Sequence, residues 1–184
     1  MKLRLKLVLT LGLALAATGA RGQETTAGET VLSDFETMDW ETLHSDNARI
    51  EASAVDGQKG KAVQIAYDLK APGEWVILGK NMAVGDSAGK SFQFFMKATG
   101  SQTSNLEFKL IDADGSVYGS KVPLAASGKF VSVTLDMKTF TYWWGGNSTL
   151  DKVVRVEFAV SGGSGKGTVA LDELKQVPAE ATGK

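Results

Sequence analysis

Short stretches in which apolar and polar residues alternate recur along the chain from residue 31 to residue 175. In one of them Phe92, Phe94 and Met96 take one side, while Gln93 and Lys97 take the other. Alternation with a period of two is the pattern of a β-strand with one buried face. Ten strands are predicted in this way, over residues 31–36, 48–54, 61–69, 74–78, 90–98, 105–111, 116–122, 130–136, 153–160 and 168–175.

Residue pairs that favour tight turns separate these stretches, among them Asp56-Gly57, Pro72-Gly73 and Asp114-Gly115. Glycine and aspartate accept the backbone angles that such turns need. Beyond residue 22 no stretch keeps a helical period of apolar residues over ten positions. About ten short strands in a chain of 184 residues predict an all-β fold, an antiparallel β-sandwich of the jelly-roll kind in one domain.

The first 22 residues have a different pattern. Three basic residues precede an apolar run over residues 7–17, and small residues follow at 19, 20 and 22. This is the composition of a secretory signal peptide, and the run is too short to span a bilayer. We therefore expect a signal peptide at 1–22, a flexible arm at 23–29, the β-domain at 30–177 and a tail at 178–184. The expected location is secreted or periplasmic, in a bacterium, without membrane insertion.

Charge and cysteine content narrow the class of protein. Removing residues 1–22 takes away four of the 20 basic residues and none of the 21 acidic ones, so the formal charge changes from −1 to −5. Nucleic-acid binding needs clustered Lys and Arg, which the sequence lacks. The chain has no cysteine, so disulfides are excluded even in an exported protein.

Candidate catalytic residues are few. His44 is the one histidine, which excludes Cys-His catalysis and multi-histidine metal sites. A Ser-His-Asp triad would need His44, and no Gly-x-Ser-x-Gly motif accompanies it. A glycosidase needs two carboxyl groups beside the scissile bond, and no Glu-x-Asp-x-Glu triplet is present on any expected strand. We therefore expect no enzymatic activity. A glycosidase or lyase is kept as the last of three functional hypotheses, after the two non-catalytic ones given below.

Acidic residues at the two ends of the domain suggest a metal site. Asp34 and Glu36 are two positions apart on an expected strand, so both side chains leave one face. Asp172 lies on the last expected strand, which in sandwiches often pairs near the first. Hard oxygen ligands suit Ca²⁺. A structural Ca²⁺ held by Asp34, Glu36 and Asp172 is expected, and the alternative is three ordinary solvated side chains.

Two adjacent tryptophans stand beside a glycine pair in residues 140–147, a stretch expected to be a loop. They could close one end of the sandwich, or form a platform that stacks on a sugar ring; we expect one ring in solvent and the other buried. Glycan recognition combines such rings with polar groups that bond hydroxyls. The candidate ligand-binding residues are Trp143, Trp144, Tyr142, Trp75, Tyr118, Gln93, Lys109 and Arg155.

The order of the stretches 31–36, 60–69, 109–115, 142–146 and 167–174 resembles carbohydrate-binding modules with a galactose-binding-like β-jelly roll. The resemblance implies a non-catalytic domain, often attached to glycan-degrading enzymes, with a structural Ca²⁺ near its first and last strands. Asp34, Glu36 and Asp172 match the acidic positions, although Glu173 stands where a second aspartate is usual. The expected partner is a polysaccharide or oligosaccharide. The alternative is an envelope structural or protein-interaction module, so a glycan-degrading enzyme or an envelope protein is a possible partner.

Overall fold

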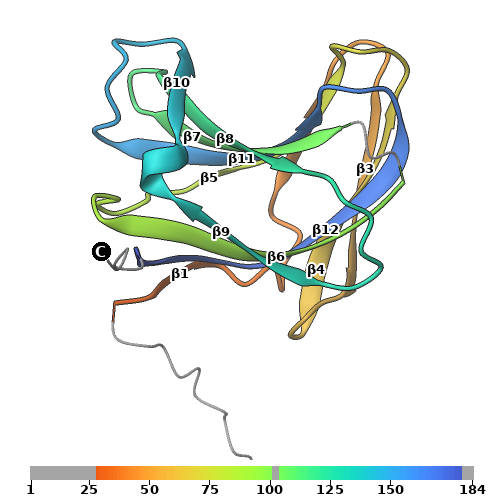
Figure 1. The fold of residues 1–184 in the computed structure, drawn as a ribbon, viewed down its shortest axis with the longest axis horizontal. Coiled ribbons are helices and arrows are strands. Elements are labelled where there is room, and N and C mark those ends of the chain that lie inside the picture. The colour runs from red at the N-terminus through yellow and green to blue at the C-terminus, as the bar shows by residue number, and fades with distance from the viewer. Residues whose placement is uncertain (1–27, 101–103, 180–184) are drawn as a thin grey trace, which may run out of the picture.

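A computed structural model describes residues 28–100 and 104–179, which form twelve strands and one short 3-10 helix, η1 (Met137–Thr139). The strands make two six-stranded sheets, which Figure 1 shows as a lower and an upper layer. The lower one, here called the terminal sheet, contains β1 (Thr30–Ser33), β3 (Arg49–Asp56), β4 (Lys61–Leu69), β6 (Lys90–Gly100), β9 (Val131–Asp136) and β12 (Gly165–Pro178). The upper one, here called the tryptophan sheet, contains β2 (Glu41–His44), β5 (Trp75–Asn81), β7 (Asn105–Asp112), β8 (Val117–Pro123), β10 (Thr141–Trp144) and β11 (Val153–Ser161).

All the strand pairs in both sheets are antiparallel, which confirms the predicted antiparallel β-sandwich. The terminal sheet has the order β3-β4-β12-β6-β9 with β1 on β12, and the tryptophan sheet has the order β10-β8-β7-β11-β5-β2. The first and last strands therefore pair, as the sequence led us to expect. Within the described ranges no helix is long and apolar enough to cross a membrane.

Each of the ten predicted strands corresponds to an observed strand, but two further strands, β2 and β10, were not predicted. Each has four residues, forms one edge of the tryptophan sheet and is largely exposed, so neither shows the alternation that marks a half-buried strand. The prediction that the tryptophan pair lies in a loop was therefore wrong, because both residues belong to β10. The expected signal peptide lies outside the described residues, and β12 includes Pro178, the first residue of the expected tail.

Aromatic rings fill the space between the sheets. The ring of Phe158 lies 4.9 Å from that of Phe108 and 5.1 Å from that of Phe94, measured between centroids. Phe35 stacks on Trp40 at 5.0 Å, and both rings also contact Phe158. Phe94, Phe108 and Phe158 are fully buried and come from β6, β7 and β11, so these contacts join the two sheets. The packing gives the outer face of the tryptophan sheet a firm support.

Candidate functional site

The strand register identifies the side chains that share the outer face of the tryptophan sheet. Glu157 of β11 lies opposite Gly79 of β5 on one side and opposite Lys109 of β7 on the other. Lys109 in turn lies opposite Gly119 of β8. Opposed residues point to the same face of a sheet, so these four form one row across four strands. The row is about 14 Å long, because strands are spaced by roughly 4.8 Å.

A β-bulge in β10 brings both tryptophans to this face. Tyr142 pairs with Tyr118 and Trp144 pairs with Val117, so the register shifts by one residue between them. In a regular strand neighbouring side chains would point to opposite faces. Here the rings of Trp143 and Trp144 lie 5.7 Å apart, and Lys109 Nζ of the row lies 5.5 Å from the Trp144 ring.

Trp143 lies directly on the backbone of β8. A Cβ added to Gly119 would lie 2.5 Å from atoms of the Trp143 indole, so only glycine leaves room for the ring. The ring also keeps a polar link, because Trp143 Nε1 donates to Thr141 Oγ1 at 3.0 Å. Trp143 is half-buried, whereas Trp144 is 52% exposed. The expectation of one exposed ring is met, but the second ring is covered only in part.

The turn after β10 is held by the turn between β7 and β8. Asn147 N donates to Asp114 Oδ2 at 2.7 Å, and Ser116 N donates to Asp114 Oδ1 at 2.8 Å. These two backbone bonds lower the pKa of Asp114. Gly145 and Gly146 have positive φ angles of 84° and 40°, and an added Cβ on either would meet this turn within 2.5 Å. The glycine pair therefore allows the close approach that fixes β10 in place.

A hollow of about 410 Å³ lies on this face between Trp75 of β5 and Trp144 of β10, and we call it the groove. Trp75, which is 37% exposed, forms one wall, and Trp144 forms the other. Side chains of β7 and β11 make up the floor between them: Glu107, Lys109, Glu157 and Ser161. Two exposed aromatic walls with a polar floor match the general composition of small-ligand sites.

The charged groups of the face are paired with one another. Glu107 accepts a hydrogen bond from Ser161 Oγ at 2.7 Å and lies within 3.5 Å of the ammonium groups of Lys109 and Lys121. Arg155 Nε donates to Glu157 at 2.8 Å, and its Nη1 donates to Glu41 at 2.8 Å. Burial alone would lower the pKa of Arg155, but the bonds to Glu157 and Glu41 outweigh it and raise the pKa. The three carboxylates and three cations in these pairs balance one another, but Glu74 also lines the groove and adds a fourth carboxylate.

Five of the eight predicted ligand-binding residues meet on this face: Trp75, Lys109, Trp143, Trp144 and Arg155. Tyr118 and Tyr142 contact each other at 5.7 Å, and their hydroxyls donate to the carbonyls of Ser148 and Gly145. These tyrosines support the turn after β10. Gln93 lies on β6 of the terminal sheet, where it donates to Thr134 at 3.4 Å, so it is not part of the groove.

Sequence reasoning missed several residues of this face. Glu41 lies on β2, which was not predicted, and Gly79 and Gly119 carry no side chain to draw attention. The alternation in β7 did place Glu107 on the same strand face as Lys109, and this is the one sequence signal that could have identified Glu107 as a site residue. The other residues become visible only through the register between strands.

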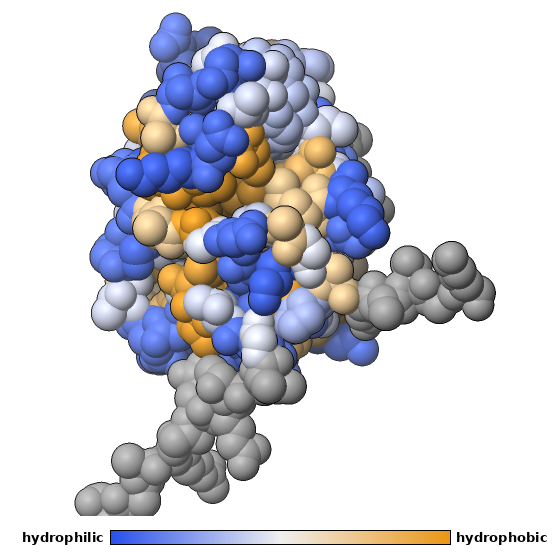
Figure 2. Space-filling view, turned by 90° about the vertical axis from the view of Figure 1, so that its left-hand side faces the viewer, coloured by the Kyte–Doolittle hydropathy of each residue, from blue (hydrophilic) through white to orange (hydrophobic). Residues whose placement is uncertain are grey.

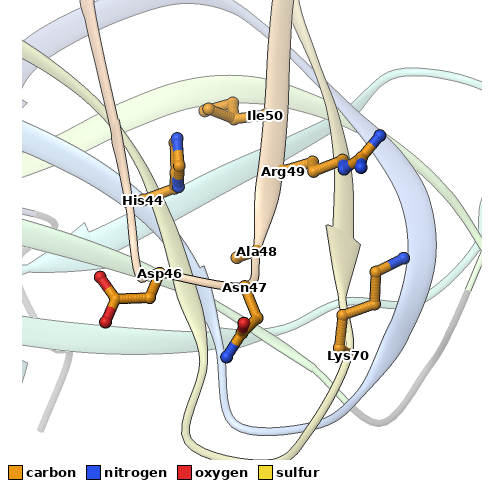
Figure 3. A pocket seen from close by; sticks show the side chains of 7 residues that line it. All are labelled: His44, Asp46, Asn47, Ala48, Arg49, Ile50 and Lys70. Atoms are coloured by element: carbon orange, nitrogen blue, oxygen red, sulfur yellow. The ribbon is translucent and has the colours of Figure 1, made fainter.

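Two other hollows are less suited to a ring-shaped ligand. One of about 570 Å³ lies at the corner between β2 and β3, and no Phe, Tyr or Trp lines it. Figure 3 shows Arg49 and Lys70 pointing to one side of it, with His44 and Asp46 on the other. Among the residues that the structure describes, no carboxylate or serine hydroxyl bonds to His44; its Nδ1 lies 2.8 Å from the backbone carbonyl oxygen of Ser45.

The second of these hollows, of about 350 Å³, opens at one end of the sandwich. Apolar side chains line it, from the β5–β6 loop, η1, the β10–β11 loop and the start of β11: Val84, Met137, Leu150 and Val153. Figure 2 shows this end of the molecule, where hydrophobic surface is visible between hydrophilic groups. Charged neighbours are Asp86, Asp151 and Lys152.

Two of the three predicted metal ligands converge on the turn between β3 and β4. Glu36 Oε1 accepts a hydrogen bond from Lys61 N at 3.0 Å, and Asp172 Oδ2 accepts one from Lys59 N at 3.0 Å. Asp172 is fully buried, its Oδ1 has no hydrogen-bond partner within residues 28–100 and 104–179, and burial raises its pKa. A Cβ added to Gly57 would lie 2.6 Å from Asp172 Oδ2 and 2.9 Å from the carbonyl oxygen of Lys61. Oxygen atoms therefore crowd around this turn.

Asp34 has a different role. The expected strand over residues 31–36 ends at Ser33, because Phe35 takes a left-handed conformation with φ 56° and buries its ring against Trp40. The prediction that Asp34 and Glu36 share one strand face was therefore wrong. Asp34 is exposed, and its Oδ1 accepts a hydrogen bond from Glu36 N at 3.2 Å. Among the described residues no three His, Cys, Asp or Glu side chains gather around one point, so a cation here would also need carbonyl ligands.

The chain has the β-sandwich fold found in carbohydrate-binding modules, which confirms the resemblance at the level of fold. It superposes with a TM-score of 0.70 and 17% identity on a family 11 carbohydrate-binding module from Clostridium thermocellum solved with a β-1,3-1,4-mixed-linked tetrasaccharide, covering 84% of this chain and 98% of that one. A family 29 carbohydrate-binding module gives a TM-score of 0.53 at 16% identity, with 83% and 94% covered. An exo-β-agarase gives a TM-score of 0.59 at 16% identity, but this chain covers only 26% of the agarase. No family model and no curated protein sequence matches.

Proposed function

We propose that this protein binds a polysaccharide or oligosaccharide in the groove of the tryptophan sheet without cleaving it. The observation that carries the proposal is the pair of exposed indoles, Trp75 and Trp144, which line one groove together with Glu107, Lys109 and Glu157. Sugar rings offer apolar C–H faces edged by hydroxyls. Indole rings stack on the faces, and the floor supplies hydrogen-bond partners for the hydroxyls. The similarity in fold to a module solved with a bound tetrasaccharide supports this assignment.

Binding without cleavage fits the state of the two floor carboxylates. Glu107 is bonded to Ser161 and close to two lysines, and Glu157 accepts a charged hydrogen bond from Arg155. A glycosidase needs one carboxyl group that carries a proton to the leaving oxygen. Carboxylates that are already paired with cations act as hydrogen-bond acceptors instead. The match to part of an agarase is compatible with a binding domain inside a larger enzyme.

Export and Ca²⁺ binding complete the proposal. The composition of residues 1–22 supports secretion or transfer to the periplasm, where extracellular polysaccharide would be met. The orphaned and buried Oδ1 of Asp172, together with Glu36 Oε1 and the carbonyl oxygens of the β3–β4 turn, fits a hard cation. Ca²⁺ bound there would fasten the end of β1 to β12 and to the β3–β4 turn, in a structural role.

Affinity electrophoresis in gels containing soluble polysaccharides tests the binding function. Wild-type protein should be retarded by at least one polysaccharide, and Trp144→Ala or Trp75→Ala should weaken the affinity. The loss of one stacked ring is worth about 1–1.5 kcal/mol, or roughly a 5- to 12-fold rise in Kd. Phe130→Ala is the matched control, because its half-buried ring contacts Lys97 on the terminal sheet.

Two outcomes would contradict the proposal. The first is a wild-type protein that migrates identically in all gels. The second is retardation that survives in the Trp75→Ala, Trp144→Ala double variant with its circular dichroism unchanged, because the ligand would then bind elsewhere.

A further inference from the structure

The guanidinium group of Arg155 lies flat on the backbone of β5. A Cβ added to Gly79 would lie 2.2 Å from Nη2 of Arg155, 2.8 Å from Cζ and 3.2 Å from Nε. The absence of a side chain at Gly79 is therefore what lets the group rest on the sheet. Gly79 stands opposite Glu157, at the end of the same row that has Trp143 on Gly119 at its other end. Two flat groups thus rest on glycines at the two ends of the row.

The hydrogen bonds of Arg155 leave one edge of the guanidinium free. Of its five N–H donors, Nε bonds to Glu157 and the two on Nη1 bond to Glu41 and Asn81, at 2.8, 2.8 and 3.0 Å. Both donors of Nη2 have no partner among the residues that the structure describes. The side chain is only 15% exposed, so its position is held by these contacts and not by solvent. A fixed pair of donors beside the groove is suited to two neighbouring oxygen atoms of a ligand.

One guanidinium there faces two carboxylates, so the formal charge around that edge is negative. Glu41 and Glu157 both contact the guanidinium, and the second carboxylate of the floor, Glu107, is paired with Lys109 and Lys121. A carboxylate or sulfate group arriving at Nη2 could accept from both free donors, but Glu41 and Glu157 would repel it at short range. Charge repulsion of this kind discriminates against the wrong ligand more than it alters the affinity for the right one.

We propose that Arg155 is the specificity-determining residue of the groove and that the groove selects uncharged glycans. The two Nη2 donors bond adjacent hydroxyl oxygens of a sugar ring, while Glu41 and Glu157 exclude glycans that carry carboxylate or sulfate groups. Gly79 acts as a positioning residue, because it sets the height and tilt of the guanidinium. This inference rests on the proposed glycan-binding function and specifies the class of glycan.

Pairs of polymers with related backbones and different charge test glycan binding and charge selection separately. Hydroxyethylcellulose and agarose are the neutral probes, and carboxymethylcellulose and carrageenan are their anionic counterparts. Wild-type protein should be retained by at least one neutral probe and at least tenfold more weakly by its counterpart at 0.15 M salt. Retention by none of the four overturns the proposed function. Equal or stronger retention by the anionic counterpart overturns the charge selection and leaves glycan binding intact.

Three variants test the residues. Gly79→Ala should weaken neutral binding about tenfold, the loss expected for one charged hydrogen bond. Gly85→Ala is its matched control, because an added Cβ there meets nothing within 4 Å, and it should bind as the wild type does. Arg155→Lys keeps the charge but loses the planar pair of donors, so it should bind as weakly as Gly79→Ala.

Glu41→Gln provides a readout that a purely structural role would not produce. It removes one of the two carboxylates that contact Arg155, at a position whose side chain is 62% exposed, so the local formal charge becomes neutral instead of negative. The variant should gain retention by the anionic polymer, and added salt should abolish that gain. If Gly79→Ala binds neutral polymer as well as Gly85→Ala does, or if Glu41→Gln gains nothing, Arg155 does not set the specificity.

Discussion

Replacing Asp172 with asparagine should remove the response of the protein's thermal stability to Ca²⁺. The wild-type carboxylate is fully buried, and its Oδ1 has no partner in the part of the chain that the structure describes; the nearby Glu36 contributes a second carboxylate to the same turn. The substitution keeps an oxygen that can accept the hydrogen bond from Lys59 N, so the turn itself should persist. It removes the negative charge that a cation needs.

The size of the effect follows from linkage between binding and folding. A ligand at 100 times its Kd that binds only the folded state adds about 2.7 kcal/mol to the free energy of unfolding. For a domain of this size each kcal/mol shifts Tm by roughly 2–4 °C, so saturating Ca²⁺ should raise the wild-type Tm by about 5–11 °C. Differential scanning fluorimetry in excess Ca²⁺ and in EDTA measures the shift. Asp172→Asn should show less than about 2 °C of it, which on the same scale is under 1 kcal/mol.

The pH dependence gives an independent check. Burial raises the pKa of Asp172 in the folded state above its unfolded value, so the metal-free folded protein takes up a proton more readily than the unfolded chain. The associated penalty is absent below the unfolded pKa and grows as the pH rises through the folded pKa. In EDTA the wild type should therefore lose stability relative to Asp172→Asn as the pH rises, and the gain from Ca²⁺ should shrink as the pH falls. An equal Tm for the wild type in Ca²⁺ and EDTA at pH 7, or an equal Ca²⁺ response in both proteins, would refute the metal site.

Two further substitutions test the support of the groove. Asp114→Asn loses one of the two hydrogen bonds that fix the turn after β10. It should therefore speed hydrogen exchange at the Asn147 amide and weaken glycan binding roughly 2- to 10-fold. Unchanged exchange would show that the glycines alone hold the turn. Phe158→Ala should cost about 3–5 kcal/mol in denaturant unfolding, because Phe158 is fully buried among four other rings; a loss under about 1 kcal/mol would mean that these contacts do not join the sheets.

The fold was largely predictable because most strands have one buried face. The run Lys61–Leu69 alternates in the structure as it does in the sequence, with Val63, Ile65 and Tyr67 buried. β2 and β10 escaped because an exposed edge strand has no burial period to detect. The left-handed Phe35 was equally hidden: a residue with a side chain rarely takes that conformation, and only its contact with Trp40 explains it here.

The composition of the site was easier to predict than its geometry. Aromatic and charged residues in polar positions gave Trp75, Trp144, Lys109 and Arg155, which do meet on one face. Gln93 has the same character, yet it lies on the other sheet. The alternation tells which side of a strand a residue takes, but not to which sheet the strand belongs. The bulge that turns Trp143 and Trp144 to one face depends on the pairing of β10 with β8, and no local sequence pattern reveals that pairing.

The most direct test of glycan binding on the tryptophan sheet is a titration followed through the indole N–H signals of the four tryptophans in a nitrogen-15 correlation spectrum. Trp75, Trp143 and Trp144 lie on the proposed face, while Trp40 is buried in the core beside Phe35 and serves as an internal control. With an oligosaccharide of the polymer that retains the protein, the signals of Trp75 and Trp144 should shift in a saturable way and that of Trp40 should stay in place. Saturable binding that leaves the Trp75 and Trp144 signals unmoved would place the ligand elsewhere on the molecule.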